Sequence, residues 1–108
     1  GQPIGKFQAI RHKIADMATK IEASKQFTYS VAWRVNNGEY PVREISMAKL
    51  LSAQMACEVA DQTIQVLGGY GYMKEYEVER AYRDIRLNRI GAGTDEVMLE
   101  VIGRSYGL

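Results

Sequence analysis

The sequence is poor in several features that mark particular classes of protein. It has one cysteine, Cys57, so no disulfide can form within the chain, and the small apolar residues around it predict a core residue over a reactive thiol. Its 14 lysines and arginines are interspersed with 13 aspartates and glutamates, for a formal net charge of +1. A basic block that could track a phosphate backbone is lacking, so nucleic acid is not an expected partner.

Long apolar runs and metal-ligand spacings are lacking as well. No segment approaches the roughly 20 apolar residues that cross a bilayer, and no signal-like segment is present, so we expect a soluble domain without a membrane partner. No group of His, Cys, Asp or Glu has the spacing of a metal site, and none is predicted. The opening "GQPIGKFQ" has neither an initiator methionine nor a targeting pattern, which favours a fragment of a longer protein.

What the sequence does contain is helical periodicity. Apolar residues recur at spacings of three and four from Phe7 to Val35, which predicts one long amphipathic helix. The helix should end at "NNGEYP", because Asn37 and Gly38 suit a left-handed cap and Pro41 can begin the next helix. A helix of this length needs partners along it.

A second helix is predicted over about residues 42–67, and its small residues would let neighbouring helices approach closely. They are Ala48, Ala53, Ala56 and Ala60. This helix should therefore occupy the middle of the domain and end at the double glycine that follows it.

A third helix is predicted over about residues 77–89 and a fourth over about 95–106, with Thr94 as the N-cap and Gly107 as the stop. Acids at the start of the fourth helix suit the helix dipole. The scan finds no strand pattern. The chain is therefore predicted to be all-α, a single domain over residues 1–108 folded as an up-and-down four-helix bundle.

Two loop motifs point to a family. Gln65 stands in "QVLGGYGY", and 27 positions later Ala92 stands in "IGAGTDEV", with "YRDIRLNRI" between them. This combination resembles the C-terminal domain of the flavin-dependent acyl-CoA dehydrogenases, whose members carry Q-[IVL]-x-G-G-x-G-[YF], an "RD" pair and a G-T-x-E loop. The resemblance covers essentially the whole chain, and the two motifs together are far more specific than either alone.

The resemblance implies two groups of cofactor-binding residues. One group would meet the adenosine and pyrophosphate of an FAD held by a neighbouring subunit: Gln8, Gln65, Gly68 and Gly69. The other would lie beside the flavin of its own subunit: Thr94 and Glu96. The residue types fit, because glycine leaves the backbone open to a ligand and the first turn of a helix attracts anions. The purely structural alternatives are that Gly68 and Gly69 only end a helix, and that Thr94 and Glu96 only cap the next helix and suit its dipole.

The resemblance also explains why a residue with an inert side chain, Ala92, stands at this loop position. Short- and medium-chain members of the family have a glutamate at this loop position, which removes the α-proton of the acyl-CoA thioester. Isovaleryl and long-chain members resemble this chain in having small residues there, and their glutamate comes from a preceding helix, which would lie upstream of Gly1. The catalytic role left to Ala92 is donation of its backbone N–H to the thioester carbonyl.

The resemblance therefore implies an FAD-dependent acyl-CoA dehydrogenase that oxidises a CH–CH bond of an acyl-CoA thioester. It implies a homotetramer built as a dimer of dimers, an electron-transfer flavoprotein as partner, and a location in bacterial cytoplasm or the mitochondrial matrix. Residues 1–108 alone should be inactive. A non-catalytic bundle used for oligomerisation and a free-standing interaction module remain as alternatives. The resemblance identifies neither the acyl chain of the substrate nor the electron acceptor that would distinguish a dehydrogenase from an oxidase.

Overall fold

The computed structural model describes all residues, 1–108, and they form helices and turns without a strand. In chain order the elements are η1 (Ile4–Lys6), α1 (Gln8–Asn36), α2 (Val42–Leu67), α3 (Gly69–Tyr72), α4 (Glu77–Arg86), η2 (Leu87–Arg89) and α5 (Asp95–Ser105). The all-α prediction is confirmed.

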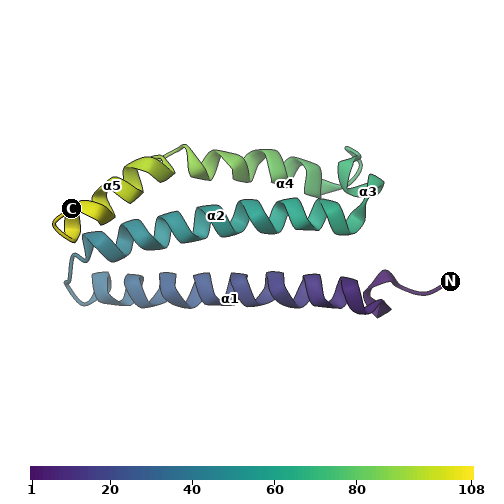
Figure 1. The fold of residues 1–108 in the computed structure, drawn as a ribbon, viewed down its shortest axis with the longest axis horizontal. Helices are drawn as coiled ribbons and strands as arrows, with labels where there is room; N and C mark the ends of the chain where they lie inside the picture. Colours follow the sequence, from purple (N-terminus) through teal and green to yellow (C-terminus); the bar gives the residue numbers. More distant parts are fainter.

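The helices are arranged in three rows (Figure 1). α1 and α2 run antiparallel, and α4 and α5 follow one another back along the other side of α2. The four predicted helices are present in the predicted order, but α4 and α5 share one row. The central place predicted for α2 is confirmed, because Ala48, Ala53 and Ala60 are among the few buried residues of the chain.

The helix ends follow the residues expected to set them. α1 is capped at Asn37, and Gly38 takes the left-handed φ of 86° that turns the chain towards α2. The Thr94 hydroxyl accepts a hydrogen bond from the backbone N–H of Val97 at 3.3 Å and caps α5. α4 becomes a 3-10 turn after Arg86, and the single turn of α3 was not predicted.

The three rows make a thin layer with little interior. Its extents are 56 × 26 × 23 Å, and its radius of gyration is 16.8 Å, compared with about 13 Å for a compact domain of this length. Only nine of the 108 residues are buried, and large apolar side chains such as Ile14, Ile21 and Trp33 are exposed. Cys57 is half-buried, so it is not a core residue. None of the helices combines the length and the hydropathy needed to span a membrane.

Candidate functional site

The predicted site residues fall into two groups that lie far apart along the layer (Figure 1). The first group lies where α1 begins and α2 ends: Gln8, Gln65, Gly68 and Gly69. The second group lies where the chain enters α5, beside the first half of α2: Ala92, Thr94 and Glu96. One copy of the chain therefore does not bring the two groups together around a single ligand.

The loop over residues 90–94, here called the α5 entry loop, has an unusual backbone. Ala92 has a φ of 54° and is the only non-glycine residue of the chain with a positive φ, and Gly93 follows it with a φ of 100°. The left-handed conformation costs an ordinary L-residue about 1–2 kcal/mol. Strain of this kind clusters at functional sites, where the surrounding structure holds it in place.

The α5 entry loop also presents free backbone donors. None of the N–H groups of residues 92–96 donates a hydrogen bond within the chain, and the next two, of Val97 and Met98, are bound to the side chain and the carbonyl of Thr94. A run of unpaired N–H groups at the positive end of a helix dipole favours a negatively charged or strongly polar acceptor. This part of the loop can therefore hold an anion or a polarised carbonyl.

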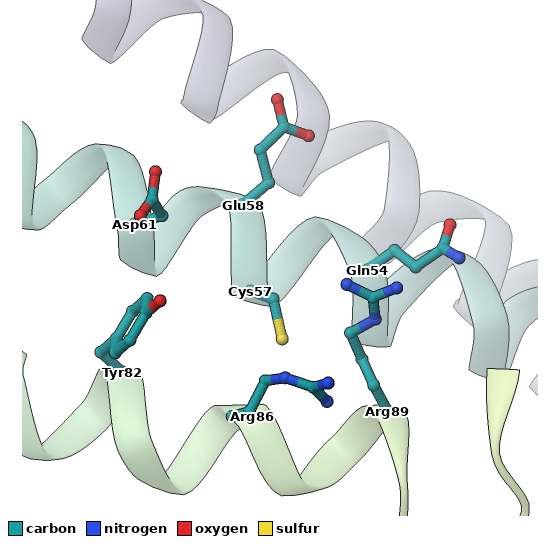
Figure 2. Close-up of a pocket in the computed structure, with 7 residues that line it drawn as sticks. All are labelled: Gln54, Cys57, Glu58, Asp61, Tyr82, Arg86 and Arg89. Carbon is teal, nitrogen blue, oxygen red and sulfur yellow. The ribbon is translucent and has the colours of Figure 1, made fainter.

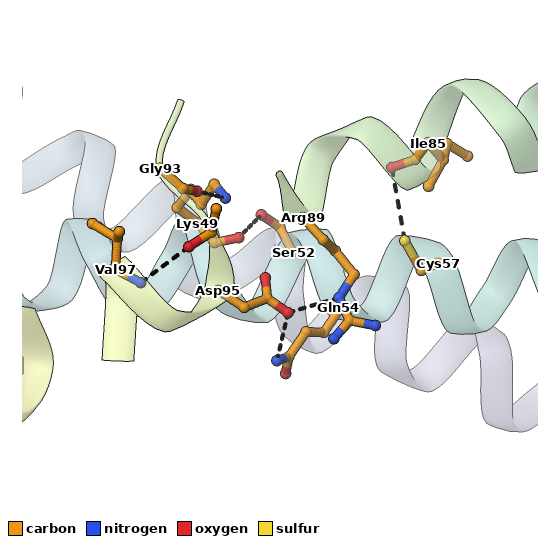
Figure 3. Close-up of polar contacts among 10 residues, drawn as sticks. Lys49, Ser52, Gln54, Cys57, Ile85, Arg89, Gly93, Asp95 and Val97 are labelled. Atoms are coloured by element: carbon orange, nitrogen blue, oxygen red, sulfur yellow. Dashed lines mark hydrogen bonds and ion pairs between the residues drawn. The ribbon is translucent and has the colours of Figure 1, made fainter. Parts of the chain in front are cut away.

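Four side chains hold this loop against α2 and the end of η2 (Figure 3). Asp95 accepts hydrogen bonds on Oδ2 from Arg89 Nε at 2.7 Å and from Gln54 Nε2 at 3.2 Å. The Lys49 ammonium donates to the carbonyl of Gly93. The loop is therefore fixed from both sides of its left-handed residue.

The carboxylate of Asp95 is deeply buried, with its side chain 7% exposed, and its Oδ1 is buried without a hydrogen-bond partner in the chain. Burial acts to raise the pKa of Asp95. The hydrogen bonds from Arg89 and Gln54, with the charges of Arg89 and Lys49, outweigh burial and hold the pKa below its ordinary value. Asp95 is therefore a structural anion at neutral pH.

A groove of about 640 Å³ opens beside the α5 entry loop, between α2 and η2. Ala92 lines it together with Lys49, Ser52, Met55 and Leu87. Its volume is within the range of small-molecule sites, and Lys49 adds a positive charge beside the free N–H groups. Two more hollows continue along the same, mainly apolar side of α2. One, of about 430 Å³, shares Lys49 and Ser52 with the groove, and the other, of about 290 Å³, shares Met55 with it.

The glycines that follow α2 differ in what the fold requires of them. A Cβ on Gly71 would lie 2.8 Å from the carbonyl oxygen of Ile64, so α3 packs on α2 only with glycine there. Gly68 has a φ of 60°, which also requires glycine. Gly69 has an ordinary φ and open space around it. Glycine at position 69 is therefore unexplained by the fold of this chain and fits the close approach of a ligand.

A polar groove of about 430 Å³ lies between α2 and α4 (Figure 2). Arg86 and Arg89 face it together with Glu58 and Asp61, and the thiol of Cys57 lies 3.7 Å from the carbonyl oxygen of Ile85. Opposite charges balance there, and no predicted site residue lines it. No cluster of three or more His, Cys, Asp or Glu side chains could hold a metal ion.

Sequence reasoning missed the residues that support the α5 entry loop: Lys49, Gln54, Arg89 and Asp95. From the sequence, Asp95 is expected only to be an acid favoured by the helix dipole. The usable signal was an arginine and an aspartate placed directly on either side of a loop that contains two glycines.

Comparison with known proteins matches residues 1–107 to the family model described as acyl-CoA dehydrogenase, C-terminal domain. The mitochondrial isovaleryl-CoA dehydrogenase of Oryza sativa subsp. japonica is 46% identical over 104 residues, which cover 96% of this chain and 25% of that protein. The crystal structure of acyl-CoA dehydrogenase from Geobacillus kaustophilus superposes with a TM-score of 0.97 at 42% identity, covering 100% of this chain and 28% of that one. The FAD complex of PigA superposes with a TM-score of 0.92 at 30% identity, again over 100% and 28% of the two chains. The chain thus spans about a quarter of the length of these proteins.

Proposed function

Since the chain belongs to the acyl-CoA dehydrogenase C-terminal domain family, we propose that it is the helical domain of a longer FAD-dependent enzyme that oxidises an acyl-CoA thioester at its α and β carbons. The observation that carries the proposal is the α5 entry loop. Its left-handed Ala92 lines a groove of small-molecule size, and the N–H groups of residues 92–96 have no hydrogen-bond partner within the chain. Such donors stabilise the negative charge that develops on a thioester carbonyl when the α-proton leaves.

The chain's residues fit a bound FAD in both predicted groups. Open space at Gly69 and the exposed side chain of Gln65 suit the close approach of a flat, polyanionic ligand. Thr94 and Glu96 are among the residues with free N–H groups at the start of α5. FAD supplies the acceptor for the hydride that leaves the β-carbon. Because the two groups lie far apart in one copy, we assign Gln8, Gln65, Gly68 and Gly69 to the FAD of a neighbouring subunit.

The residues of the α5 entry loop would bind and orient the thioester without moving its proton. The backbone N–H of Ala92 donates to the thioester carbonyl, and Lys49 holds the next carbonyl, that of Gly93, in place. The methyl side chain of Ala92 cannot accept a proton. We therefore assign the base that removes the α-proton to a carboxylate outside residues 1–108, for which the small residues Gly91 and Ala92 leave room.

The exposed apolar side of the layer supports association with further protein. The hollows along α2, one of which Ile21 lines, would be costly to leave in water, as would exposed apolar side chains elsewhere on α1 such as Ile14 and Trp33. We propose that a homotetramer, arranged as a dimer of dimers, covers part of this surface, and that an electron-transfer flavoprotein accepts the electrons. The enzyme would work in bacterial cytoplasm or in the mitochondrial matrix.

The test uses the full-length protein that carries this chain. Its visible spectrum is recorded as purified, and the protein is then titrated anaerobically with a panel of acyl-CoA thioesters. The expected result is an oxidised flavin spectrum that bleaches with at least one thioester, which also identifies the acyl class. A colourless protein that takes up no FAD and responds to no thioester would contradict the proposal and favour a bundle used only for oligomerisation.

A further inference from the structure

Arg89 and Asp95 stand directly on either side of the α5 entry loop. Their ion pair, 2.7 Å from Arg89 Nε to Asp95 Oδ2, therefore joins the two ends of the five residues between them. Asp95 is the most deeply buried carboxylate among the ion pairs of the chain, at 7% exposure compared with 17% for Glu79, the next. The Arg89 side chain is 38% exposed, so only the carboxylate end of the pair is removed from water. A pair with one buried end is less screened than a pair with both ends in solvent, so it can hold a loop in one conformation.

The same carboxylate ties the loop to α2. Gln54 donates to the oxygen that also accepts from Arg89, whereas Oδ1 has no partner in the chain. All the side-chain hydrogen bonds to this buried charge therefore come through one oxygen and two donors, and the charge of Lys49 adds to them. Removal of either donor leaves the carboxylate poorly paired, and a poorly paired buried charge is strongly unfavourable.

What the loop holds between these ends is a conformation that alanine disfavours. In an unconstrained loop, Ala92 would occupy the right-handed or extended regions in preference to the left-handed one, by about ten-fold or more. Its N–H would then point elsewhere. The tether from Lys49 acts on the Gly93 carbonyl, one residue further on, and leaves the φ of Ala92 to be set by the closure of the loop.

We propose that Arg89 and Asp95 form a positioning pair that keeps Ala92 left-handed and so aims its backbone N–H into the groove lined by Lys49 and Ser52. Neither side chain touches the ligand, and both act through the loop that they close. The identity of the ligand as a thioester carbonyl rests on the proposed function, whereas the control of the conformation of Ala92 does not.

The test compares Asp95→Asn with Glu100→Gln in the full-length, FAD-loaded protein. Glu100 pairs with Arg104 at 2.6 Å within α5, but both side chains are largely exposed and neither forms a hydrogen bond to the loop, so this variant is the matched control. With Asp95→Asn we expect kcat to fall about ten-fold at nearly constant KM, because the lost donor acts on charge that develops after binding. The control should keep its kcat. An unchanged kcat in Asp95→Asn would overturn the proposal.

A second variant separates positioning from general loss of structure. Glycine takes the left-handed conformation without penalty and keeps the backbone N–H. Ala92→Gly introduced into the Asp95→Asn protein should therefore recover at least about three-fold of the lost kcat. Equal activity of the single and double variants would show that the pair does not act through the φ of residue 92. Should Asp95→Asn fail to fold, Arg89→Lys keeps the charge, loses the planar donor and serves in its place.

A crystal structure of the Asp95→Asn protein gives a readout that does not depend on catalysis. The expected result is a residue 92 outside the left-handed region, with the α5 helix intact. A positive φ retained at residue 92 would overturn the positioning pair, even in an active enzyme. A wild-type protein without flavin or turnover would instead refute the proposed function, and the φ of residue 92 in the variant would still decide the role of the pair.

Discussion

At the scale of single residues, two glycines of the turn after α2 differ in role: the packing of the fold requires Gly71, whereas it does not require Gly69. Gly71→Ala would place a Cβ 2.8 Å from Ile64 O and 2.9 Å from Ile64 Cα, and backbone atoms cannot move aside cheaply. Overpacking of this kind costs about 1–3 kcal/mol, so we expect a clear fall in the free energy of unfolding, measured by chemical denaturation. Gly69→Ala should change that free energy by less than about 0.5 kcal/mol, because nothing lies near its added methyl group.

The Gly69→Ala variant also makes a prediction about cofactor binding. Gly69→Ala should weaken the affinity of the full-length protein for FAD, measured by equilibrium titration of the apoprotein, because the methyl group would occupy space that we assign to the ligand. A stable Gly69→Ala protein with unchanged affinity for FAD would show that no ligand approaches this backbone position closely.

Asp95 makes a second residue-scale prediction, on pH. Its pKa in the folded state lies below the ordinary value of about 3.9, because Arg89, Gln54 and Lys49 outweigh its burial. The ionised carboxylate therefore stabilises the fold above that pH, and the contribution is lost as the pH falls through the folded-state pKa. We expect Asp95→Asn to be about 2 kcal/mol less stable than wild type at pH 7. The gap should narrow below about pH 4.

Urea denaturation at pH 7 and at pH 3.5 measures this difference. Glu100→Gln again serves as the control, since its ion pair with Arg104 is exposed and should contribute less than about 1 kcal/mol at either pH. A gap between Asp95→Asn and wild type that stays constant across this range would contradict an ionised, stabilising Asp95.

Residue roles could be predicted from the sequence where they depend on local geometry. Thr94 as a cap and Gly38 as a left-handed turn residue follow from their types and their places at helix ends, and both are confirmed. The contacts of Asp95 could not be predicted in this way. They depend on Gln54, which is 41 positions away in the sequence and comes near only because α5 packs on α2.

At the scale of the element, alanine substitutions at two glycines with open surroundings should change the stability of the fold in opposite directions. Gly103 lies within α5 and Gly38 lies just beyond α1 with a φ of 86°, and a Cβ would meet nothing within 4 Å at either position. Their effects therefore come from the backbone alone. Gly103→Ala should stabilise by about 0.5–1 kcal/mol, because alanine is the better helix former. Gly38→Ala should destabilise by about 1 kcal/mol, because alanine resists a positive φ.

Chemical denaturation of the two variants beside wild type measures both signs in one experiment. A loss of stability in Gly103→Ala would mean that another part of the full-length protein packs against this position. A neutral Gly38→Ala would mean that the turn between α1 and α2 relaxes to a conformation that alanine accepts.

The long elements were predictable because their periodicity is long. α1 and α2 match their predicted ranges to within about a residue, since 26 to 29 residues of repeated spacing outweigh any local ambiguity. The four residues of α3, "GYGY", are too short to show a period, and two of them are glycines, which favour turns. The last turn predicted for α4 tightens into η2, a change that propensity does not reveal.

At the scale of the whole molecule, the sequence indicated the central helix but not the flat arrangement around it. Small residues placed α2 in the middle, as found. The apolar residues of α1 predicted burial along its length, yet Ile14 and Ile21 are 47% and 42% exposed because α1 packs chiefly on one helix. A periodic pattern says which face of a helix is apolar, and it does not say whether the covering surface belongs to the same domain.

The uncovered side of α2 gives the last prediction. Met55 lines two of the hollows on the apolar side, whereas Asp61 lies six residues further along α2 and lines the polar groove shown in Figure 2. Met55→Lys places a charge where we expect other parts of the assembled protein to pack, at a cost of a few kcal/mol unless the charge reaches water. Asp61→Lys places the same side chain on the same helix, facing solvent.

The expected outcome for Met55→Lys in the full-length protein is a smaller assembly in sedimentation velocity, together with weaker retention of FAD, because the proposed cofactor site is shared between subunits. Asp61→Lys should keep the wild-type mass and flavin content. Because the two variants introduce the same residue into one helix, a difference between them reports which side of the layer is covered. Equal behaviour of the two proteins would mean that the apolar side of α2 remains in contact with water in the full-length protein, and the exposed apolar surface would then need another explanation.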